Sequence, residues 1–287
     1  YGNFQQMLMT HGYNIPPAPS SIDYSTFGGA VANNAGGMRS VKYGYTRDYI
    51  NSVRLVLANG EVMETGLITK KALNKKKSLA TLEGEIYRTI DSIVRENPEL
   101  IAQTKPALLS NNSGYDIWSI KDAKGNIDLT KLIVGSQGTL GIMSELTVDA
   151  EAYNPKNTLH LAYFDSLENA TNAITAILPL EPSALEVIDY NLIEFVEATC
   201  PNHLTNLVQK PYPKVILFVE FDDHKKRKRK KVSKKTTKIF EKFAYKFLQT
   251  DDEFDQEDIW KLRDSAAAVL WQSAGNKKPV PIIGDAS

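Results

Sequence analysis

The sequence predicts an α+β protein of two domains. In the first half, two β-favouring runs flank Asn59-Gly60, a dipeptide that accepts positive φ in a tight hairpin turn. After Asn154-Pro155, a dipeptide typical of turns, apolar runs of strand length alternate with amphipathic helical patterns. A length of 287 residues also favours two domains. We therefore place one domain at residues 1–153 and a second at residues 154–287.

The first domain is expected to contain a mostly antiparallel sheet. Residues 53–65 read as the hairpin, and apolar residues at helical spacing predict a helix with one buried face over 82–95. The lysine-rich segment 70–77 is expected to be a solvated loop. Residues 131–134 and 142–149 read as strands on either side of a glycine-rich turn.

The second domain is expected to be an α/β sandwich with helices on one side of an apolar sheet. A helix starts at Asp165, with Glu168 at its third position as a possible capping box. A long helix passes through Phe240 and Phe247. The other predicted elements are strands at 158–164, 184–188 and 215–221, and helices at 189–198 and from about 256 to 274.

The composition is that of an ordinary globular protein. The formal net charge is zero and 42% of residues are hydrophobic, so no global field favours nucleic acid. Cys200 is the only cysteine, which excludes an internal disulfide and fits a reducing compartment. The sequence contains no apolar run of membrane-spanning length and shows no signal-peptide pattern. We expect a cytoplasmic protein, peripheral at most to the inner face of a membrane.

Two glycine-rich segments are the most informative feature. Residues 25–37 read Ser-Thr-Phe-Gly-Gly-Ala-Val-Ala-Asn-Asn-Ala-Gly-Gly and are followed by Tyr-Gly-Tyr-Thr-Arg-Asp at 43–48. Residues 132–143 read Leu-Ile-Val-Gly-Ser-Gln-Gly-Thr-Leu-Gly-Ile-Met. Glycine lets a main chain approach a ligand closely, at an entropic cost that a simple connector need not carry. The spacing is neither that of a nicotinamide-binding G-x-G-x-x-G turn nor that of a P-loop, whose lysine is absent.

Taken in this order, the segments resemble the TIGG-x-x-A-x-N-A-G-G and GS-E/Q-GTLGI signatures of FAD-linked oxidases of the vanillyl-alcohol oxidase type. The branch that the chain resembles is that of the D-lactate, glycolate and D-2-hydroxyglutarate dehydrogenases. The resemblance implies the later part of a PCMH-type FAD-binding domain followed by a ferredoxin-like cap domain, in a chain truncated at both ends. The FAD contacts that it implies are Thr26, Gly28, Gly29, Asn34, Gly36, Gly37, Gly44, Thr46, Gly138 and Ile142.

Some members of this family attach the flavin to a histidine. Because the histidines here lie outside the glycine-rich segments, we expect non-covalent FAD; they are His11, His160, His203 and His224.

Arg263 lies in Trp-Lys-Leu-Arg-Asp-Ser at 260–265, which resembles the family's W-x-L-R-E segment. The resemblance implies that this arginine holds the substrate carboxylate, a role that suits the planar guanidinium. The alternative is a surface arginine paired with Asp258 or Asp264. In the 2-hydroxyglutarate branch a threonine follows one turn later, and Ala267 at that position argues against a dicarboxylate substrate.

The resemblance implies oxidation of a D-2-hydroxy acid, such as D-lactate or glycolate, by hydride transfer to the flavin, with an unidentified electron acceptor. The family's metal site and general base are expected beyond Ser287, so no metal ligand and no base is assigned. One alternative is another reductase with the same FAD domain, such as the enolpyruvyl-sugar reductase. The W-x-L-R segment and the cap domain argue against it.

The other alternative is a non-enzymatic binder that uses the basic run 225–238. Ten of these fourteen residues are Lys or Arg, and none is aromatic, which leaves single-stranded nucleic acid without support. Six of the eight residues at 251–258 are acidic and could neutralise the run locally. A solvated helix face is the default interpretation. A weak contact with a membrane surface stays open, and no nucleic acid is expected.

Overall fold

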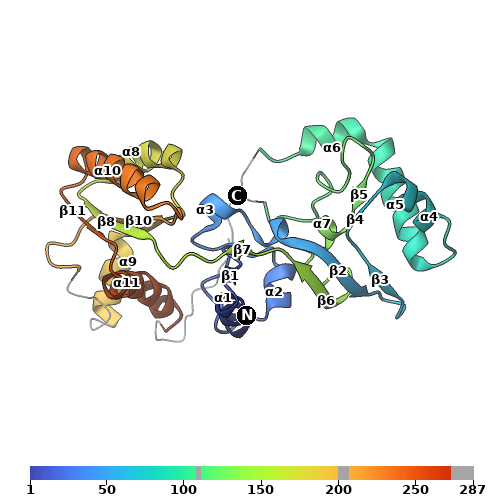
Figure 1. Ribbon diagram of the computed structural model, residues 1–287, viewed down its shortest axis with the longest axis horizontal. Helices are drawn as coiled ribbons and strands as arrows, with labels where there is room; N and C mark the ends of the chain where they lie inside the picture. Colours follow the sequence, from blue (N-terminus) through green and yellow to red (C-terminus); the bar gives the residue numbers. More distant parts are fainter. Residues whose placement is uncertain (108–110, 200–206, 273–287) are drawn as a thin grey trace. The chain divides into compact units, whose positions relative to one another are not determined.

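The computed structural model describes residues 1–107, 111–199 and 207–272, with only the backbone for Thr199 and residues 265–272. The chain divides into two compact units (Figure 1). Unit 1 contains residues 1–37 and 44–152. Of the described residues, unit 2 contains Met38–Tyr43 and those from Tyr153 to Gln272.

Unit 1 is built around an antiparallel sheet in the order β3 (Val62–Glu64), β2 (Ile50–Val56), β6 (Ile142–Val148). The predicted hairpin is confirmed: β2 pairs with β3, and Gly60 in the turn has a φ of 86°. Two short pairs complete the strands of the described part of unit 1. They are β1 (Tyr13–Asn14) with β7 (Glu151–Ala152), and β4 (Leu67–Ile68) with β5 (Ile127–Asp128).

Helix α5 (Leu82–Glu96) packs on this sheet, as its apolar spacing predicts, with Tyr87 fully buried against Leu55 and Ile133. Thr81 caps its N-terminus by accepting a hydrogen bond from the Gly84 amide. The other helices of the described part of unit 1 are α1 (Gly2–Thr10), α2 (Phe27–Ala32), the 3₁₀ turn Thr46–Asp48, α4 (Lys70–Lys77), α6 (Pro98–Thr104) and α7 (Thr130–Ile133).

Two predictions for unit 1 are wrong. The lysine-rich segment is a helix, α4 (Lys70–Lys77), because Thr69 caps it and Leu73 is buried in the core. Residues 131–134 are not a strand: α7 (Thr130–Ile133) is a single helical turn that buries Ile133. A short apolar run is compatible with either structure until its packing is known.

Unit 2 contains a four-stranded antiparallel sheet in the order β11-β8-β10-β9. The strands are β8 (Thr158–Phe164), β9 (Ala184–Asp189), β10 (Val215–Phe221) and β11 (Lys246–Thr250). Helices α8 (Leu167–Ile177) and α10 (Lys226–Phe243) connect β8 to β9 and β10 to β11. This order and these crossovers confirm the ferredoxin-like sandwich.

Helices cover both faces of this sheet, not one as predicted. Phe164 and Phe240 lie in the core between the sheet and α8 and α10. On the other face, Phe218 packs with residues of α9 (Tyr190–Thr199) and α11 (Glu253–Gln272). For this reason every residue of β8 and β10 is buried.

Two further details differ from the sequence prediction. The cap of α8 is Ser166, which accepts a hydrogen bond from the Asn169 amide, and not Asp165. Phe247 does not continue α10, because the helix ends at Phe243. Phe247 lies in β11, where it pairs with Ala162 of β8. Its spacing from Phe243 is helical, but Ala244 is extended, which ends the helix.

Candidate functional site

The first glycine-rich segment forms a short helix and a turn. Thr26 caps α2, since its Oγ1 accepts a hydrogen bond from the Gly29 amide at 3.0 Å. Gly28 and Gly29 therefore lie inside a helix. A Cβ built on Gly28 would have no atom within 4 Å, so packing does not demand glycine there.

The turn after α2 depends on left-handed backbone and on buried polar side chains. Asn34 has a φ of 46° and is buried. Its Oδ1 accepts a hydrogen bond from the Arg47 amide at 2.9 Å, and its Nδ2 donates to Asn112 Oδ1 at 2.8 Å. Thr46 Oγ1 donates to the Ala35 carbonyl at 2.6 Å. The side chains of Asn34 and Thr46 thus shape the loop and are occupied by protein partners.

Glycines are required at two other positions of this loop. A Cβ on Gly37 would collide with the carbonyl oxygen of Ala18. Gly44 has a φ of 75°, and a Cβ there would collide with the carboxylate of Asp48. Gly36 lies between the turn and Gly37 in irregular backbone and is half-buried.

The second glycine-rich segment lies directly against the first, although about a hundred residues separate them. The Gly135 amide donates to the Val31 carbonyl at 3.0 Å, and the Gln137 amide donates to the Ala32 carbonyl at 2.9 Å. Gln137 Nε2 also donates to Asn33 Oδ1 at 2.7 Å. Main-chain hydrogen bonds therefore join the end of α2 to the turn that follows α7.

The two remaining predicted flavin contacts are exposed. Gly138 has a φ of 74°, and a Cβ there would have no atom within 4 Å. Ile142 begins β6 with 73% of its surface exposed, unusual for an isoleucine.

Arg47 fixes this arrangement from within and was not predicted as a site residue. Its guanidinium donates to Asp116 Oδ2 at 3.0 Å, and both side chains are mostly buried. Gly135 lies close enough that a Cβ there would approach Arg47 NH2 to 3.2 Å. The sequence signal was the Thr-Arg-Asp that closes the first segment. Nothing in it pointed to Asp116.

Unit 1 also contains an apolar cavity of about 490 Å³. Residues of the sheet, α5 and the turns near α7 line it, among them Leu55, Ile86 and Leu140. Tyr115, also in its lining, holds Thr139 by a 2.7 Å contact between their hydroxyl oxygens, so the cavity adjoins the second glycine-rich segment.

In unit 2, Arg263 is held by an acidic strand residue. Its Nε and NH2 donate to Glu186 Oε2 at 3.0 and 2.9 Å, and its NH1 donates to Asp264 Oδ1 at 3.1 Å. Burial would lower the pKa of Arg263, but the charge of Glu186 and the hydrogen bonds raise it above its ordinary value. The interpretation of Arg263 as an ion-paired arginine named Asp264 correctly as a partner. It did not include Glu186, which lies on β9.

A buried ion pair ties the segment Met38–Tyr43, part of which forms α3 (Ser40–Tyr43), to β10 of the same unit. Arg39 grips Glu220 through two hydrogen bonds of 3.0 Å, and Glu220 is fully buried. Asn157 and Ser183 donate to the same carboxylate at 2.8 and 2.9 Å. All these partners are distant in sequence, so no local pattern could have revealed them.

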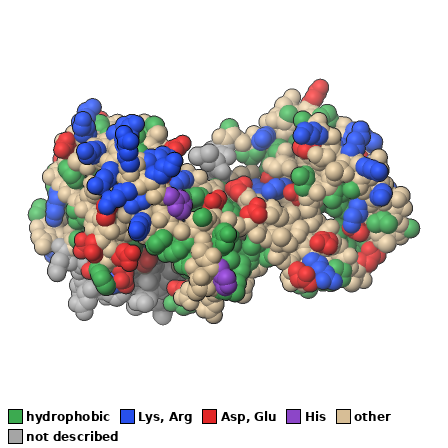
Figure 2. All heavy atoms as spheres, in the orientation of Figure 1, with side chains coloured by type: hydrophobic (Ala, Val, Ile, Leu, Met, Phe, Trp, Pro, Cys, Tyr) green, Lys and Arg blue, Asp and Glu red, His purple; other side chains and the backbone are tan. Residues whose placement is uncertain are grey.

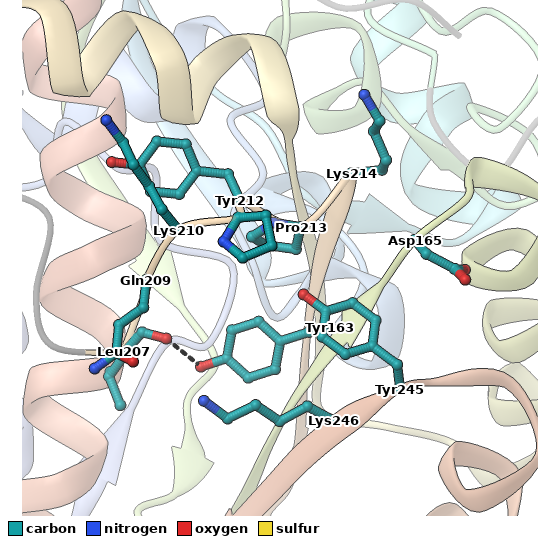
Figure 3. A pocket seen from close by; sticks show the side chains of 11 residues that line it. Tyr163, Asp165, Leu207, Gln209, Lys210, Tyr212, Pro213, Lys214, Tyr245 and Lys246 are labelled. Carbon is teal, nitrogen blue, oxygen red and sulfur yellow. Dashed lines mark hydrogen bonds between the residues drawn. The ribbon is translucent and has the colours of Figure 1, made fainter.

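A second cavity, of about 400 Å³, lies at one end of the unit 2 sheet (Figure 3). Tyr163 and Tyr245 line it, and the Tyr163 hydroxyl donates to the Leu207 carbonyl at 2.8 Å. Lys246 Nζ lies 5.1 Å from the centre of the Tyr163 ring. Neither cavity contains a catalytic constellation. Within the described ranges there is also no cluster of His, Cys, Asp or Glu suited to a metal ion, and no helix long and apolar enough to cross a membrane.

Two parts of the chain match known protein families. Residues 1–66 match the family described as FAD binding domain, and residues 154–287 match the family described as FAD linked oxidases, C-terminal domain. FAD is therefore the cofactor that the matched families indicate.

Curated relatives include a D-2-hydroxyglutarate dehydrogenase of Pantoea ananatis, 23% identical over 97% of this chain and 28% of its own length. A D-lactate dehydrogenase of Anaerostipes hadrus is 26% identical over 90% of this chain and 44% of its own length. The glycolate oxidase subunit GlcD of Bacillus subtilis is 29% identical over 65% of this chain and 29% of its own length. The chain thus spans less than a third of the length of the hydroxyglutarate dehydrogenases that it matches.

Among solved structures, an alkyldihydroxyacetonephosphate synthase shares the fold, with a TM-score of 0.58 at 17% identity, over 94% of this chain and 41% of the synthase. The match to the FAD binding domain contains the first glycine-rich segment. Residues 1–66 and 154–287 therefore match two domain families of FAD-linked oxidases, and the curated relatives similar to the chain carry the names of 2-hydroxy acid dehydrogenases and of a glycolate oxidase subunit.

Proposed function

We propose that the protein of which this chain forms part binds FAD non-covalently and oxidises a D-2-hydroxy acid, of the size of D-lactate or glycolate, by hydride transfer to the flavin. The domain matches and the names of the relatives support this proposal. The match of residues 154–287 to the C-terminal domain of FAD linked oxidases favours it over the enolpyruvyl-sugar reductase.

The observation that carries the proposal is the pair Gly28 and Gly138. A glycine inside a helix costs about 1 kcal/mol relative to alanine, yet nothing within 4 Å of Gly28 requires its absence of a side chain. Gly138 is likewise surrounded by open space. Both belong to segments that main-chain hydrogen bonds hold together. Bare backbone facing open space, on two joined segments, is the surface that a flat cofactor requires.

Bound FAD would supply the hydride acceptor. We propose that backbone around Gly28, Gly29, Gly36, Gly37 and Gly138 lies against it, with Ile142 and Thr26 at its edge. Asn34, Gly44 and Thr46 act through the shape of the loop, because the two polar side chains already have protein partners.

We further propose that Arg263 binds the substrate carboxylate. Its guanidinium is oriented by Glu186, which would keep the fork in place while an anion approaches. The remaining partners of the proposal are an electron acceptor that the sequence does not name and a weak contact with a membrane surface, without nucleic acid. The proposed location is the cytoplasm.

The cofactor is tested by titrating FAD into the purified protein and following quenching of flavin fluorescence. Gly28→Leu should lower FAD affinity at least tenfold without loss of stability, because leucine favours the helix and fills the open space. Asn74→Leu, which adds the same side chain to an exposed position of α4, is the matched control and should bind FAD normally. If the Gly28→Leu protein and the wild type bound FAD with equal affinity, Gly28 would not be part of the FAD site.

The substrate is tested on the FAD-loaded protein under anaerobic conditions. Addition of D-lactate or glycolate should bleach the oxidised-flavin absorbance, whereas D-2-hydroxyglutarate should act less well. Arg263→Met should raise the concentration of hydroxy acid needed for half-maximal bleaching by tenfold or more, with an unchanged flavin spectrum. Unaltered concentration dependence would show that another cation holds the carboxylate.

A further inference from the structure

The lysines and arginines of helix α10, apart from Arg229, lie on its solvent-exposed side. Its buried positions are Arg229, Ser233, Thr236 and Phe240, spaced by four, three and four residues as expected for a single inward face. Every other Lys and Arg from Lys225 to Lys242 is exposed. Figure 2 shows the Lys and Arg side chains gathered over the part of unit 2 where α10 lies.

The positive charge of this face is not balanced by neighbouring acids. Among the described residues, Asp223 is the one carboxylate within 4 Å of a lysine or arginine of this helix, and it pairs with Lys228 at 2.7 Å. The sequence suggested that the acidic cluster 251–258 neutralises the run. The structure shows no ion pair between the two within the described ranges. Instead, Glu257 and Asp258 pair with Lys261 of their own helix.

The reason lies in the topology of unit 2. After α10 the chain crosses the sheet as β11 and continues as α11 on the opposite face. The basic run and most of the acidic cluster are therefore separated by the thickness of the sheet. A chain with zero formal net charge consequently contains a unit with one strongly basic helical face.

The chemistry of this face favours a lipid surface over nucleic acid. It consists almost entirely of lysine, a compact point charge, and its single exposed arginine is Arg227. The two aromatic residues of α10 do not present stacking surfaces: Phe240 is fully buried, and Lys242 Nζ lies over the Phe243 ring at 4.7 Å. Base recognition relies on arginine forks and aromatic stacking. Lysines spread along the exposed side of an 18-residue helix, about 27 Å long, can contact a layer of anionic headgroups together.

We propose that the exposed face of α10 is a docking surface for a membrane that contains anionic phospholipid. This extends the weak membrane contact of the proposed function and rests on it for the partner class, but it requires neither FAD nor a hydroxy acid. The contact is electrostatic and peripheral, because the apolar face of the helix is used by the core.

The test measures co-sedimentation of the purified protein with vesicles of phosphatidylcholine alone and of phosphatidylcholine with phosphatidylserine. Binding should require phosphatidylserine and fall with added salt. The triple variant Lys230→Glu, Lys234→Glu, Lys238→Glu should bind at least tenfold more weakly. The matched control is Lys70→Glu, Lys71→Glu, Lys75→Glu on α4, which makes the same change of net charge at exposed positions and should bind like the wild type.

The other outcomes overturn the proposal. Absence of binding to phosphatidylserine vesicles, or an equal loss in both triple variants, would show that α10 is a solvated face. If the wild type bound a duplex DNA of mixed sequence, measured by fluorescence anisotropy, more tightly than it bound the phosphatidylserine vesicles, the surface would be assigned to nucleic acid. FAD titration of the same proteins keeps the two questions apart, since the α10 variant should bind FAD as the wild type does.

Discussion

In unit 1 the candidate site is held by backbone: hydrogen bonds from Gly135 and Gln137 to the end of α2 fix two glycine-rich segments. In unit 2 the structure depends on buried ionisable side chains, with Glu220 gripped by Arg39 and Arg263 by Glu186. A site held by backbone tolerates many side-chain changes but not a Cβ where main chain packs against a glycine, as at Gly37, whereas a buried charge tolerates no loss of its partner. The two units should therefore respond to different kinds of mutation.

The largest effect is expected at the buried ion pair of unit 2. Arg39→Ala would leave the Glu220 carboxylate fully buried with only Asn157 and Ser183 as donors. Breaking such a pair costs about 3–5 kcal/mol of the free energy of unfolding. Urea denaturation should show this as a large fall in the transition midpoint.

The control is Arg54→Ala, which removes an ion pair with Glu145 in which both side chains are exposed. Such pairs contribute little, so the midpoint should not change measurably. Adding Glu220→Gln to Arg39→Ala should recover part of the loss, because it removes the unpaired charge. If Arg39→Ala and Arg54→Ala behaved alike, the contrast between buried and exposed charge would be wrong here.

His160 gives unit 2 a pH dependence. It is fully buried between Phe221 and Phe240, and neither ring nitrogen has a hydrogen-bond partner among the described residues. Burial lowers its pKa from 6.5 to about 4, and the charge of Asp251 only partly opposes this.

Because burial keeps His160 neutral in the folded protein, its contribution to stability is complete above about pH 6.5. As the pH falls from 6.5 towards 4, His160 takes up a proton in the unfolded chain but not in the folded one, so this stability is lost. The loss should reach about 3 kcal/mol. His160→Met should flatten the unfolding free energy between these pH values. An unchanged pH profile in this variant would place the titration elsewhere.

The same contrast explains what the sequence predicts well. Strands β8 and β10 were predicted at their observed bounds because they are continuous apolar runs of strand length. The glycine-rich segments were found because a local backbone requirement leaves a local sequence pattern. Helix α4 was missed because a single buried residue, Leu73, anchors a run of lysines, and a short polar run has no apolar stripe to read.

Partners joined only by the fold could not be predicted. Arg39 and Glu220 are separated by 181 residues, and Arg47 and Asp116 by 69. Which strand carries the acid depends on the sheet order, which no single segment encodes. The same reason misled the expectation for 251–258: proximity in sequence suggested neutralisation of the basic run, but β11 takes the chain to the other face of the sheet.

The smallest of the three expected losses of stability concerns a glycine of unit 1. Gly37→Ala would drive a Cβ into the Ala18 carbonyl, and the main chain must shift to relieve it, at about 1–3 kcal/mol of the free energy of unfolding. Because Gly37 closes the first segment, this shift should also weaken FAD binding. Gly28→Ala adds the same atom to open space in a helix, so its unfolding free energy should stay equal or rise. Equal stability of both variants would mean that the Ala18 contact is not maintained in solution, and that the backbone of unit 1 is less strictly fixed than the charges of unit 2.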